Sequence, residues 1–183
     1  MRRLLRGLLV ASLSLLPSPA SSSSSPTRLA LLRMSSSSSS SSSASPSALF
    51  FATPLKAVVG ASADRDKYGN MVLRCYKEHK MAAVPINKRS TEIEGVATVA
   101  SLTLLSQSTS HTMGEVGVSI ITPPGVTKLI LEEGSKLGIR HFYLQPGTYD
   151  DVTDEYMASE LAGKGVNIVK GCVLVELGFS DRR

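Results

Sequence analysis

The chain has no aspartate or glutamate before Asp64, and this absence divides it into two unlike parts. Five of its 20 basic residues lie within the first 33 positions, so this leader accounts for the whole formal charge of +5. The rest of the chain carries equal numbers of acidic and basic residues. The high isoelectric point is therefore no evidence for nucleic-acid binding, which needs a basic face on the folded part.

Residues that build metal, redox and catalytic sites are also scarce. The two cysteines, Cys75 and Cys172, have neither metal-ligand nor redox-pair spacing, so we expect two reduced and largely buried thiols. His79 falls on the apolar side of an expected helix and should be packed, whereas His111 lies in a polar segment and should be exposed. No apolar run reaches the roughly 20 residues that span a membrane. These absences leave no recognisable catalytic set, no metal cluster and no membrane anchor.

The leader, residues 1–52, contains serine runs at 21–25 and 35–43. Serine tracts bury too little apolar surface to offset the entropy of ordering, so we expect this segment to be disordered. An arginine-containing, serine-rich and acid-poor composition is typical of an organelle transit peptide and favours a mitochondrial address. Plastid or secretory entry, and a leader that directs nothing, stay open. A second start at Met34 would give a cytosolic form without the arginines.

Residues 53–183 alternate short apolar runs with amphipathic segments, which predicts one α/β domain. The expected strands lie at 55–60, 81–87, 115–125 and 139–147, with one or two more within 166–177. The expected helices lie at 67–80, 126–138 and 150–165, and the weaker segment 91–110 should hold a short strand and one helical turn. Strands separated by helices favour a doubly wound parallel sheet, which binds its ligands at the carboxyl ends of the strands.

The first loop at this end, "GASADRDKYG", is suited to holding a phosphate. Gly60 permits a tight turn after the strand, and the small side chains of Ala61 and Ser62 allow a phosphate to approach the peptide N–H groups. Gly69 lies early in the following helix, where glycine costs about 1 kcal/mol relative to alanine unless close packing or a ligand needs the room. A plain structural connection between strand and helix is the alternative interpretation.

The second loop, Asn87-Lys88-Arg89, distinguishes between adenosine cofactors. An NAD-binding sheet of this type carries an acid at the end of its second strand to hold the ribose hydroxyls, and this chain has none there. Two cations favour a ribose that bears an extra phosphate, as in NADP or coenzyme A. A solvated turn is the alternative.

The third and fourth loops offer a stiff wall and an amide. Thr122 and Pro123 in "ITPPG" would pack a flat ring or a pantetheine arm, unless the prolines merely end the strand. Gln145 in "LQPG" supplies two hydrogen-bond donors and one acceptor, unless it is structural.

Together these segments resemble the small stand-alone CoA-binding domain proteins. The resemblance covers about residues 53–177 and rests on "AVVGAS", "KYGNMVLRCY", "VPINKRSTEIEGV", "SIITPPGVTKLILEEGSKLGI", "YLQPG" and "CVLVEL". These proteins are single Rossmann-type domains related to the CoA-binding region of the succinyl-CoA ligase α subunit, and the "ITPP" and "LQPG" combination most resembles their fungal branch. The resemblance implies CoA binding without an established reaction. The second domain that supplies the ligase with its phosphate-carrying histidine has no counterpart here.

The resemblance also assigns positions along the ligand. Gly60, Ala61 and Ser62 would face the pyrophosphate, with Lys67, Tyr68 and Gly69 behind them. Asn87 and Lys88 would border the adenosine and its 3′-phosphate, Thr122 and Pro123 the middle of the ligand, and Gln145 its far rim. We therefore expect a non-catalytic CoA or acyl-CoA binding protein. An NADP-linked oxidoreductase-like protein is the alternative, and a structural partner with a vestigial pocket is a third reading.

Overall fold

The computed structural model describes residues 44–180, which contain a five-stranded sheet in the order β2-β1-β5-β6-β7. Every neighbouring pair in this sheet is parallel. Its strands are β1 (Leu55–Val59), β2 (Ala83–Ile86), β5 (Val116–Ile120), β6 (His141–Leu144) and β7 (Asn167–Lys170). The strand order reverses between β1 and β5. The predicted doubly wound α/β sheet is thereby confirmed.

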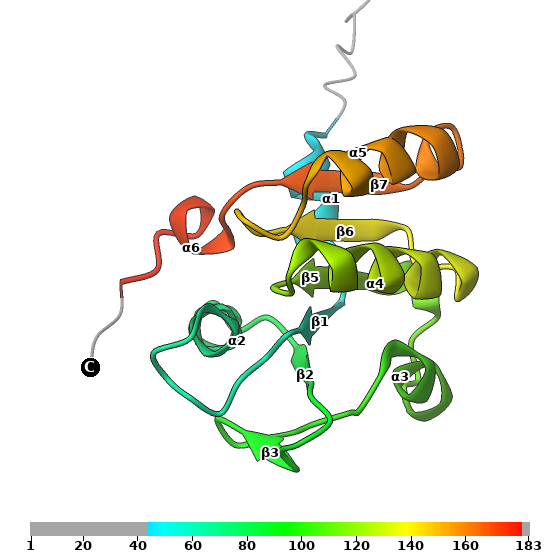
Figure 1. Ribbon diagram of the computed structural model, residues 1–183. Coiled ribbons are helices and arrows are strands. Elements are labelled where there is room, and N and C mark those ends of the chain that lie inside the picture. Colours follow the sequence, from blue (N-terminus) through cyan, green and yellow to red (C-terminus); the bar gives the residue numbers. More distant parts are fainter. Residues whose placement is uncertain (1–43, 181–183) are drawn as a thin grey trace, which may run out of the picture. The chain divides into compact units, whose positions relative to one another are not determined.

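Helices cover both faces of the sheet (Figure 1). They are α1 (Pro46–Phe51), α2 (Tyr68–Glu78), α3 (Leu102–Ser108), α4 (Pro124–Lys136), α5 (Asp151–Tyr156), which continues as the π-helical turn η2 (Met157–Leu161), and α6 (Val173–Glu176). A 3₁₀ turn, η1 (Met113–Glu115), leads into β5. Buried residues of α3, α4 and η2 share one hydrophobic core, and those of α1, α2 and α6 share a second.

The central strand β1 shows why a continuous apolar run was predicted to be a buried strand. All five of its residues are buried, with Ala57 and Val59 in the first core and Val58 in the second. Adjacent side chains of a strand point to opposite faces, so a strand covered on both sides must be apolar at nearly every position. The exception is Lys56, whose ammonium group contacts the chain before the strand.

The weak segment 91–110 folds as a hairpin followed by a short helix. The strands β3 (Glu92–Ile93) and β4 (Val96–Ala97) pair antiparallel, and α3 follows them. A single parallel bridge joins Ile86 of β2 to Val99. This segment therefore extends the β2 edge of the sheet by one residue.

The packed chain begins before the domain boundary predicted at residue 53. Ser45 caps α1 by accepting a hydrogen bond from the backbone N–H of Ala48 at 3.2 Å. Phe50 of this helix is completely buried, and its ring contacts that of Tyr143 edge-on, with centroids 5.2 Å apart. The aromatic pair attaches the end of the predicted leader to the second core. The serine runs, Met34 and the proposed targeting function lie outside the described residues.

The segment 166–177 was predicted to contain one or two strands. It contains one, β7, which is followed by the short helix α6. Gly171, which lies between them, faces Tyr143, and a Cβ there would lie 2.8 Å from the phenolic oxygen. Within residues 44–180, no helix is long and apolar enough to cross a bilayer.

Candidate functional site

The turn after β1 depends on two glycines in direct contact. Gly60 has φ +90°, and a Cβ on it would lie 2.5 Å from the carbonyl oxygen of Ile121. A Cβ on Gly69 would lie only 2.0 Å from the carbonyl oxygen of Gly60. Both positions therefore require glycine, because no side chain fits where the start of α2 packs on the end of β1. Two reasons were proposed for a glycine at position 69, close packing and a ligand. The structure supports close packing.

A polar network that the sequence did not suggest holds the rest of the first loop. Asn70 of α2 is buried and donates to the carbonyl oxygen of Ser62 at 2.9 Å and to Oε1 of Glu94 at 3.1 Å. Arg74 donates through Nε to Oδ1 of Asn70 at 2.8 Å and through Nη2 to the carbonyl oxygen of Arg65 at 3.2 Å. The β3–β4 hairpin, which carries Glu94, thus stabilises the first loop through this hydrogen bond. The spacing of Asn70 and Arg74, one helical turn apart, was the available sequence signal.

Asn87 joins the first loop to the second. Its Nδ2 donates to the carbonyl oxygen of Ala61 at 2.8 Å, and its Oδ1 accepts from the backbone N–H groups of Arg89 at 2.7 Å and Ser90 at 3.0 Å. The side chain therefore shapes both loops, and its contact with a ligand stays a prediction. Beside it, exposed Lys88 lines a cavity of about 200 Å³ between the end of β2 and α4, the Asn87 cavity.

A larger cavity of about 430 Å³, the Gln145 cavity, lies at the ends of β5 and β6. Its lining includes four of the predicted site residues, which are Tyr68, Thr122, Pro123 and Gln145. Tyr68 is 64% exposed and comes from the start of α2, whereas Thr122 and Pro123 come from the loop before α4. The stiff Pro123–Pro124 pair also supplies the first residue of α4, where a missing N–H costs nothing.

Gln145 is the most informative residue of this cavity. It is 2% exposed, and its Oε1 accepts a hydrogen bond from the backbone N–H of Val173 at 3.2 Å. Its Nε2 has no hydrogen-bond partner among residues 44–180. Buried amide donors are nearly always paired, because leaving one unpaired costs about 1–3 kcal/mol. An unpaired donor beside a cavity indicates a group that accepts a bond from it.

The two cavities gather six of the eleven predicted site residues. Gly60, Ala61, Ser62, Lys67 and Gly69 line neither cavity. They follow β1, whose neighbours in the sheet are β2 and β5, so the first loop lies between the loop that carries Asn87 and the loop that carries Thr122. The predicted residues therefore form a continuous series along the carboxyl edge of the sheet.

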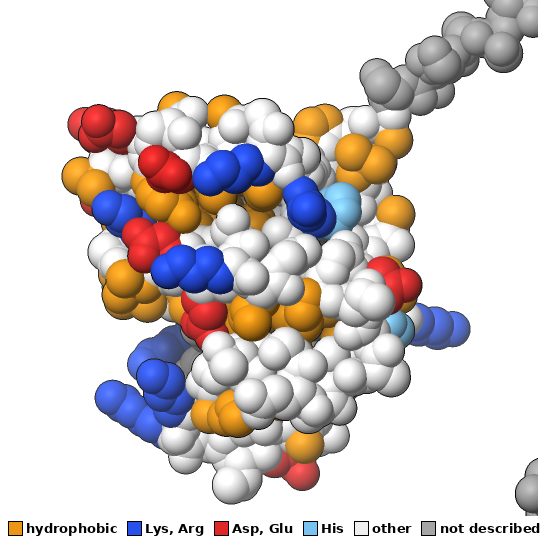
Figure 2. Space-filling model, turned by 90° about the vertical axis from the view of Figure 1, so that its right-hand side faces the viewer, with side chains coloured by type: hydrophobic (Ala, Val, Ile, Leu, Met, Phe, Trp, Pro, Cys, Tyr) orange, Lys and Arg blue, Asp and Glu red, His pale blue; other side chains and the backbone are white. Residues whose placement is uncertain are grey.

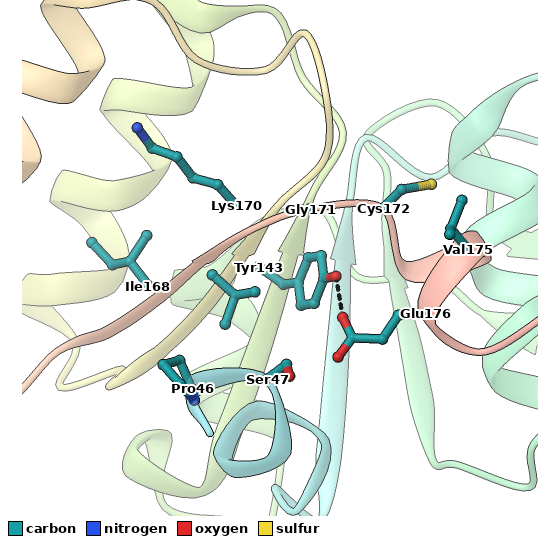
Figure 3. Close-up of a pocket in the computed structure, with 10 residues that line it drawn as sticks. Pro46, Ser47, Tyr143, Ile168, Lys170, Gly171, Cys172, Val175 and Glu176 are labelled. Carbon is teal, nitrogen blue, oxygen red and sulfur yellow. Dashed lines mark hydrogen bonds between the residues drawn. The ribbon is translucent and has the colours of Figure 1, made fainter. Parts of the chain in front are cut away.

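A third cavity, of about 620 Å³, lies beside the edge strand β7 (Figure 3). Tyr143 donates a 2.5 Å hydrogen bond to Oε2 of Glu176 there. Burial first, and then the neighbouring Glu176 carboxylate, raise the pKa of this phenol. Cys172 lines both this cavity and the Gln145 cavity, which the sequence did not suggest because the two lining segments are distant in the chain.

The remaining titratable groups correct two expectations. His79 is exposed rather than packed, because α2 ends at Glu78 and His79 is its C-cap. His111 is half-buried rather than exposed. Cys75 is buried as expected, and burial raises the pKa of its thiol to about 12, with smaller contributions from Glu78 and Cys172.

Surface charge is mixed on the side from which the strands begin. Figure 2 shows acidic and basic side chains interspersed over the upper part of this face, with a separate group of basic side chains at the lower left. This face therefore presents no extended surface of one charge.

Comparison with known proteins agrees with this geometry. The sequence model of a family described as a CoA binding domain matches residues 56–178. A conserved hypothetical protein from Pyrococcus furiosus is 26% identical, with a TM-score of 0.56 over 66% of this chain and 97% of that chain. A Thermus thermophilus protein is 23% identical, with a TM-score of 0.57 over 70% of this chain and 91% of that chain. No curated protein gave a significant match.

Proposed function

Because the chain belongs to the CoA binding domain family, we propose that it binds CoA or acyl-CoA at the carboxyl edge of its sheet. The observation that supports this most strongly is the buried Gln145 amide, whose Nε2 has no partner in residues 44–180 and which lines the cavity beyond β5 and β6. A pantetheine arm contains two amide carbonyls, either of which would accept this bond.

The nucleotide end of the ligand would lie on the other side of the first loop. Lys88 lines the Asn87 cavity, and its ammonium would meet the 3′-phosphate. Gly60, Ala61 and Ser62, between the two cavities in strand order, would face the pyrophosphate. The arm would then pass Tyr68, Thr122 and Pro123 toward Gln145. The protein would act as a binding module without a reaction of its own.

Calorimetry with CoA, dephospho-CoA, NADP and NAD tests the proposal. We expect CoA to bind, dephospho-CoA to bind more weakly by about 1.5–3 kcal/mol, and NAD barely to bind, since the lost contact is a charge-assisted one. NADP, which carries its phosphate on the 2′ oxygen, is the competing ligand. Tighter binding of NADP than of CoA would overturn the proposal.

The variant Lys88→Ala sharpens this test. It should weaken CoA binding and leave dephospho-CoA unaffected, so that the two ligands bind alike. Arg89→Ala is the matched control, because Arg89 is the adjacent cation but does not line the Asn87 cavity. Equal effects of the two substitutions would mean that the attraction is diffuse and that Lys88 has no specific role.

The Gln145 amide is tested by Gln145→Glu. When it is ionised, the new carboxyl group retains an acceptor for the Val173 N–H, so α6 should stay in place, but it has no donor for the ligand. We expect CoA to bind about tenfold to a hundredfold more weakly. Gln107→Glu makes the same change on the exposed side of α3 and should bind CoA normally. Unchanged affinity in Gln145→Glu would remove the main support for this cavity as the ligand site.

We also infer a mitochondrial location from the composition of the leader, and membership of the fungal-like branch stays a prediction. Imaging a tagged full-length chain beside one that begins at Met34 tests the location. The full-length chain should enter mitochondria and the shorter chain should stay in the cytosol. The same distribution for both would contradict the inference.

A further inference from the structure

Cys172 is the one cysteine that borders the proposed ligand cavity. It follows β7 through Gly171, is half-buried, and is not part of a disulfide. It lines the Gln145 cavity on one side and the cavity beside β7 on the other. In the view of Figure 3 its sulfur points away from Tyr143 and Glu176.

A second observation indicates that a ligand reaches this cysteine. Gln145 lines the same cavity, and its Nε2 has no partner among residues 44–180. Oε1 of the same amide accepts from the N–H of Val173, the residue after Cys172. This hydrogen bond holds the backbone beside Cys172 close to the side-chain amide of Gln145. A ligand that satisfies Gln145 therefore lies beside Cys172.

The order of the strands indicates which end of the ligand this is. The cation Lys88 follows β2 at one edge of the sheet, and Cys172 follows β7 at the other. If the phosphorylated ribose lies at Lys88, the ligand extends past the ends of β1, β5 and β6 toward β7. The end farthest from the nucleotide in CoA is its thiol.

We propose that Cys172 forms a reversible mixed disulfide with the thiol of CoA, so that the protein captures CoA covalently under oxidising conditions. This proposal rests on CoA binding at the proposed site. The oxidant is CoA disulfide. The Cys172 thiolate attacks one sulfur of CoA disulfide, a protein–CoA disulfide bond forms, the CoA–CoA disulfide bond breaks, and one CoA leaves as a thiolate. A small thiol such as dithiothreitol reverses the exchange.

The second cysteine provides an internal control. Cys75 is fully buried, and the pKa of its thiol is raised to about 12, so it holds almost no thiolate near neutral pH. Thiolate is the form that attacks a disulfide. Exchange should therefore be confined to Cys172, and the comparison with oxidised glutathione tests whether the cavity favours CoA disulfide.

The test uses the reduced full-length chain incubated with CoA disulfide, with intact mass and peptide mapping as the readout. We expect one CoA adduct, located at Cys172, which dithiothreitol removes. Its rate should saturate with CoA disulfide and exceed the rate with oxidised glutathione by about tenfold or more, because binding raises the local concentration of the reactive disulfide. Excess dephospho-CoA should slow it only at concentrations where calorimetry shows binding. Cys172→Ser should abolish the adduct, and Cys75→Ser should retain it.

Calorimetry of the same variants separates this inference from the proposed function. The wild-type protein kept reduced with dithiothreitol should bind reduced CoA, whether or not Cys172 exchanges with CoA disulfide. If CoA binds but no adduct forms, or if oxidised glutathione labels Cys172 as fast, the covalent capture is wrong and CoA binding stands. If neither the wild-type protein nor any variant binds CoA, both proposals fail.

Discussion

The two ends of the sheet differ in whether a buried polar side chain has hydrogen-bond partners for all its donors. At the end where the strands begin, Lys56 is 1% exposed, and its Nζ donates to Oγ1 of Thr53 at 2.9 Å, to the carbonyl oxygen of Phe51 at 3.2 Å, and to the carbonyl oxygen of Thr53. At the other end, Gln145 is 2% exposed, and its Nε2 has no hydrogen-bond partner in the described part of the chain.

We interpret this difference as one between polar groups that stabilise the fold and a polar group available to the proposed ligand. Burying a polar group without a partner costs more than a hydrogen bond returns, so a fold normally supplies partners for it. At the Lys56 end, Phe51 and Thr53 supply these hydrogen-bond partners. The Gln145 end combines a cavity with a donor that has no partner among residues 44–180, and this combination supports our proposal that the ligand binds there.

The strongest way to disturb the Gln145 end is to fill the turn at Gly60. In Gly60→Ala the methyl group would lie 2.5 Å from the Ile121 carbonyl oxygen, in a residue that already has φ +90°. We expect the free energy of unfolding to fall by about 3 kcal/mol and CoA binding to be lost. Denaturant titration and calorimetry measure the two effects.

Gly138→Ala is the matched control for this substitution. Gly138 has φ +88°, and a Cβ there would meet nothing within 4 Å. The backbone strain alone should cost about 1 kcal/mol and leave CoA binding intact. Equal losses in the two variants would show that the clash with Ile121, and with it the close packing of the turn, has no separate effect.

The Lys56 end can be tested through the pH dependence of stability. Burial lowers the pKa of Lys56 from 10.5 to about 8, so between these values the unfolded chain binds a proton that the folded chain does not. Through this window Lys56 makes the free energy of unfolding rise with pH, by at most about 1.4 kcal/mol per pH unit. Cys75 opposes it above pH 9.0, because burial raises its pKa from 9.0 to about 12 and the folded chain keeps the proton.

The two groups should therefore give a distinctive profile. The wild-type free energy of unfolding should rise between about pH 8 and 9 and then level off as the two contributions cancel. Lys56→Met should remove the rise, and Cys75→Ala should extend it to about pH 10. Urea titrations at half-unit pH steps measure these slopes. A rise that persists in Lys56→Met would mean that Lys56 is not the group responsible.

The sequence predicted the architecture more fully than the site. Continuous apolar runs and helical periodicity were sufficient for the five strands and for α2 and α4, because both patterns depend on neighbouring residues only. Gly69 was predicted to be required either by close packing or by a ligand, and the structure shows the close packing. The prediction that His79 packs on the apolar side of the helix was wrong, because periodicity alone does not reveal where a helix ends.

What the sequence could not supply were contacts between distant segments. Cys172 and Tyr68 line one cavity although about a hundred residues separate them. Asn70 and Arg74 are one helical turn apart, but this spacing alone does not show that Asn70 is buried or that Ser62 and Glu94 accept from its amide. Such roles depend on which loops meet in space, and one sequence without its fold does not contain that information in a local pattern.

The smallest expected effect concerns the β3–β4 hairpin, which stabilises the first loop through Glu94. Oε1 of Glu94 accepts from Asn70 and lies 3.2 Å from Nε of Arg65, whose side chain is 63% exposed. Glu94→Ala should lower the free energy of unfolding by less than about 1 kcal/mol, since exposed ion pairs contribute little. Glu94→Gln keeps an acceptor for Asn70 and should have a smaller effect still. Amide hydrogen exchange should nevertheless quicken in residues 61–67 of Glu94→Ala while β6 and β7 stay unchanged. If exchange in 61–67 did not change, Asn70 and Arg74 alone would hold the loop. The Gln145 end would then resemble the Lys56 end, because its loop would not depend on a contact from the β3–β4 hairpin.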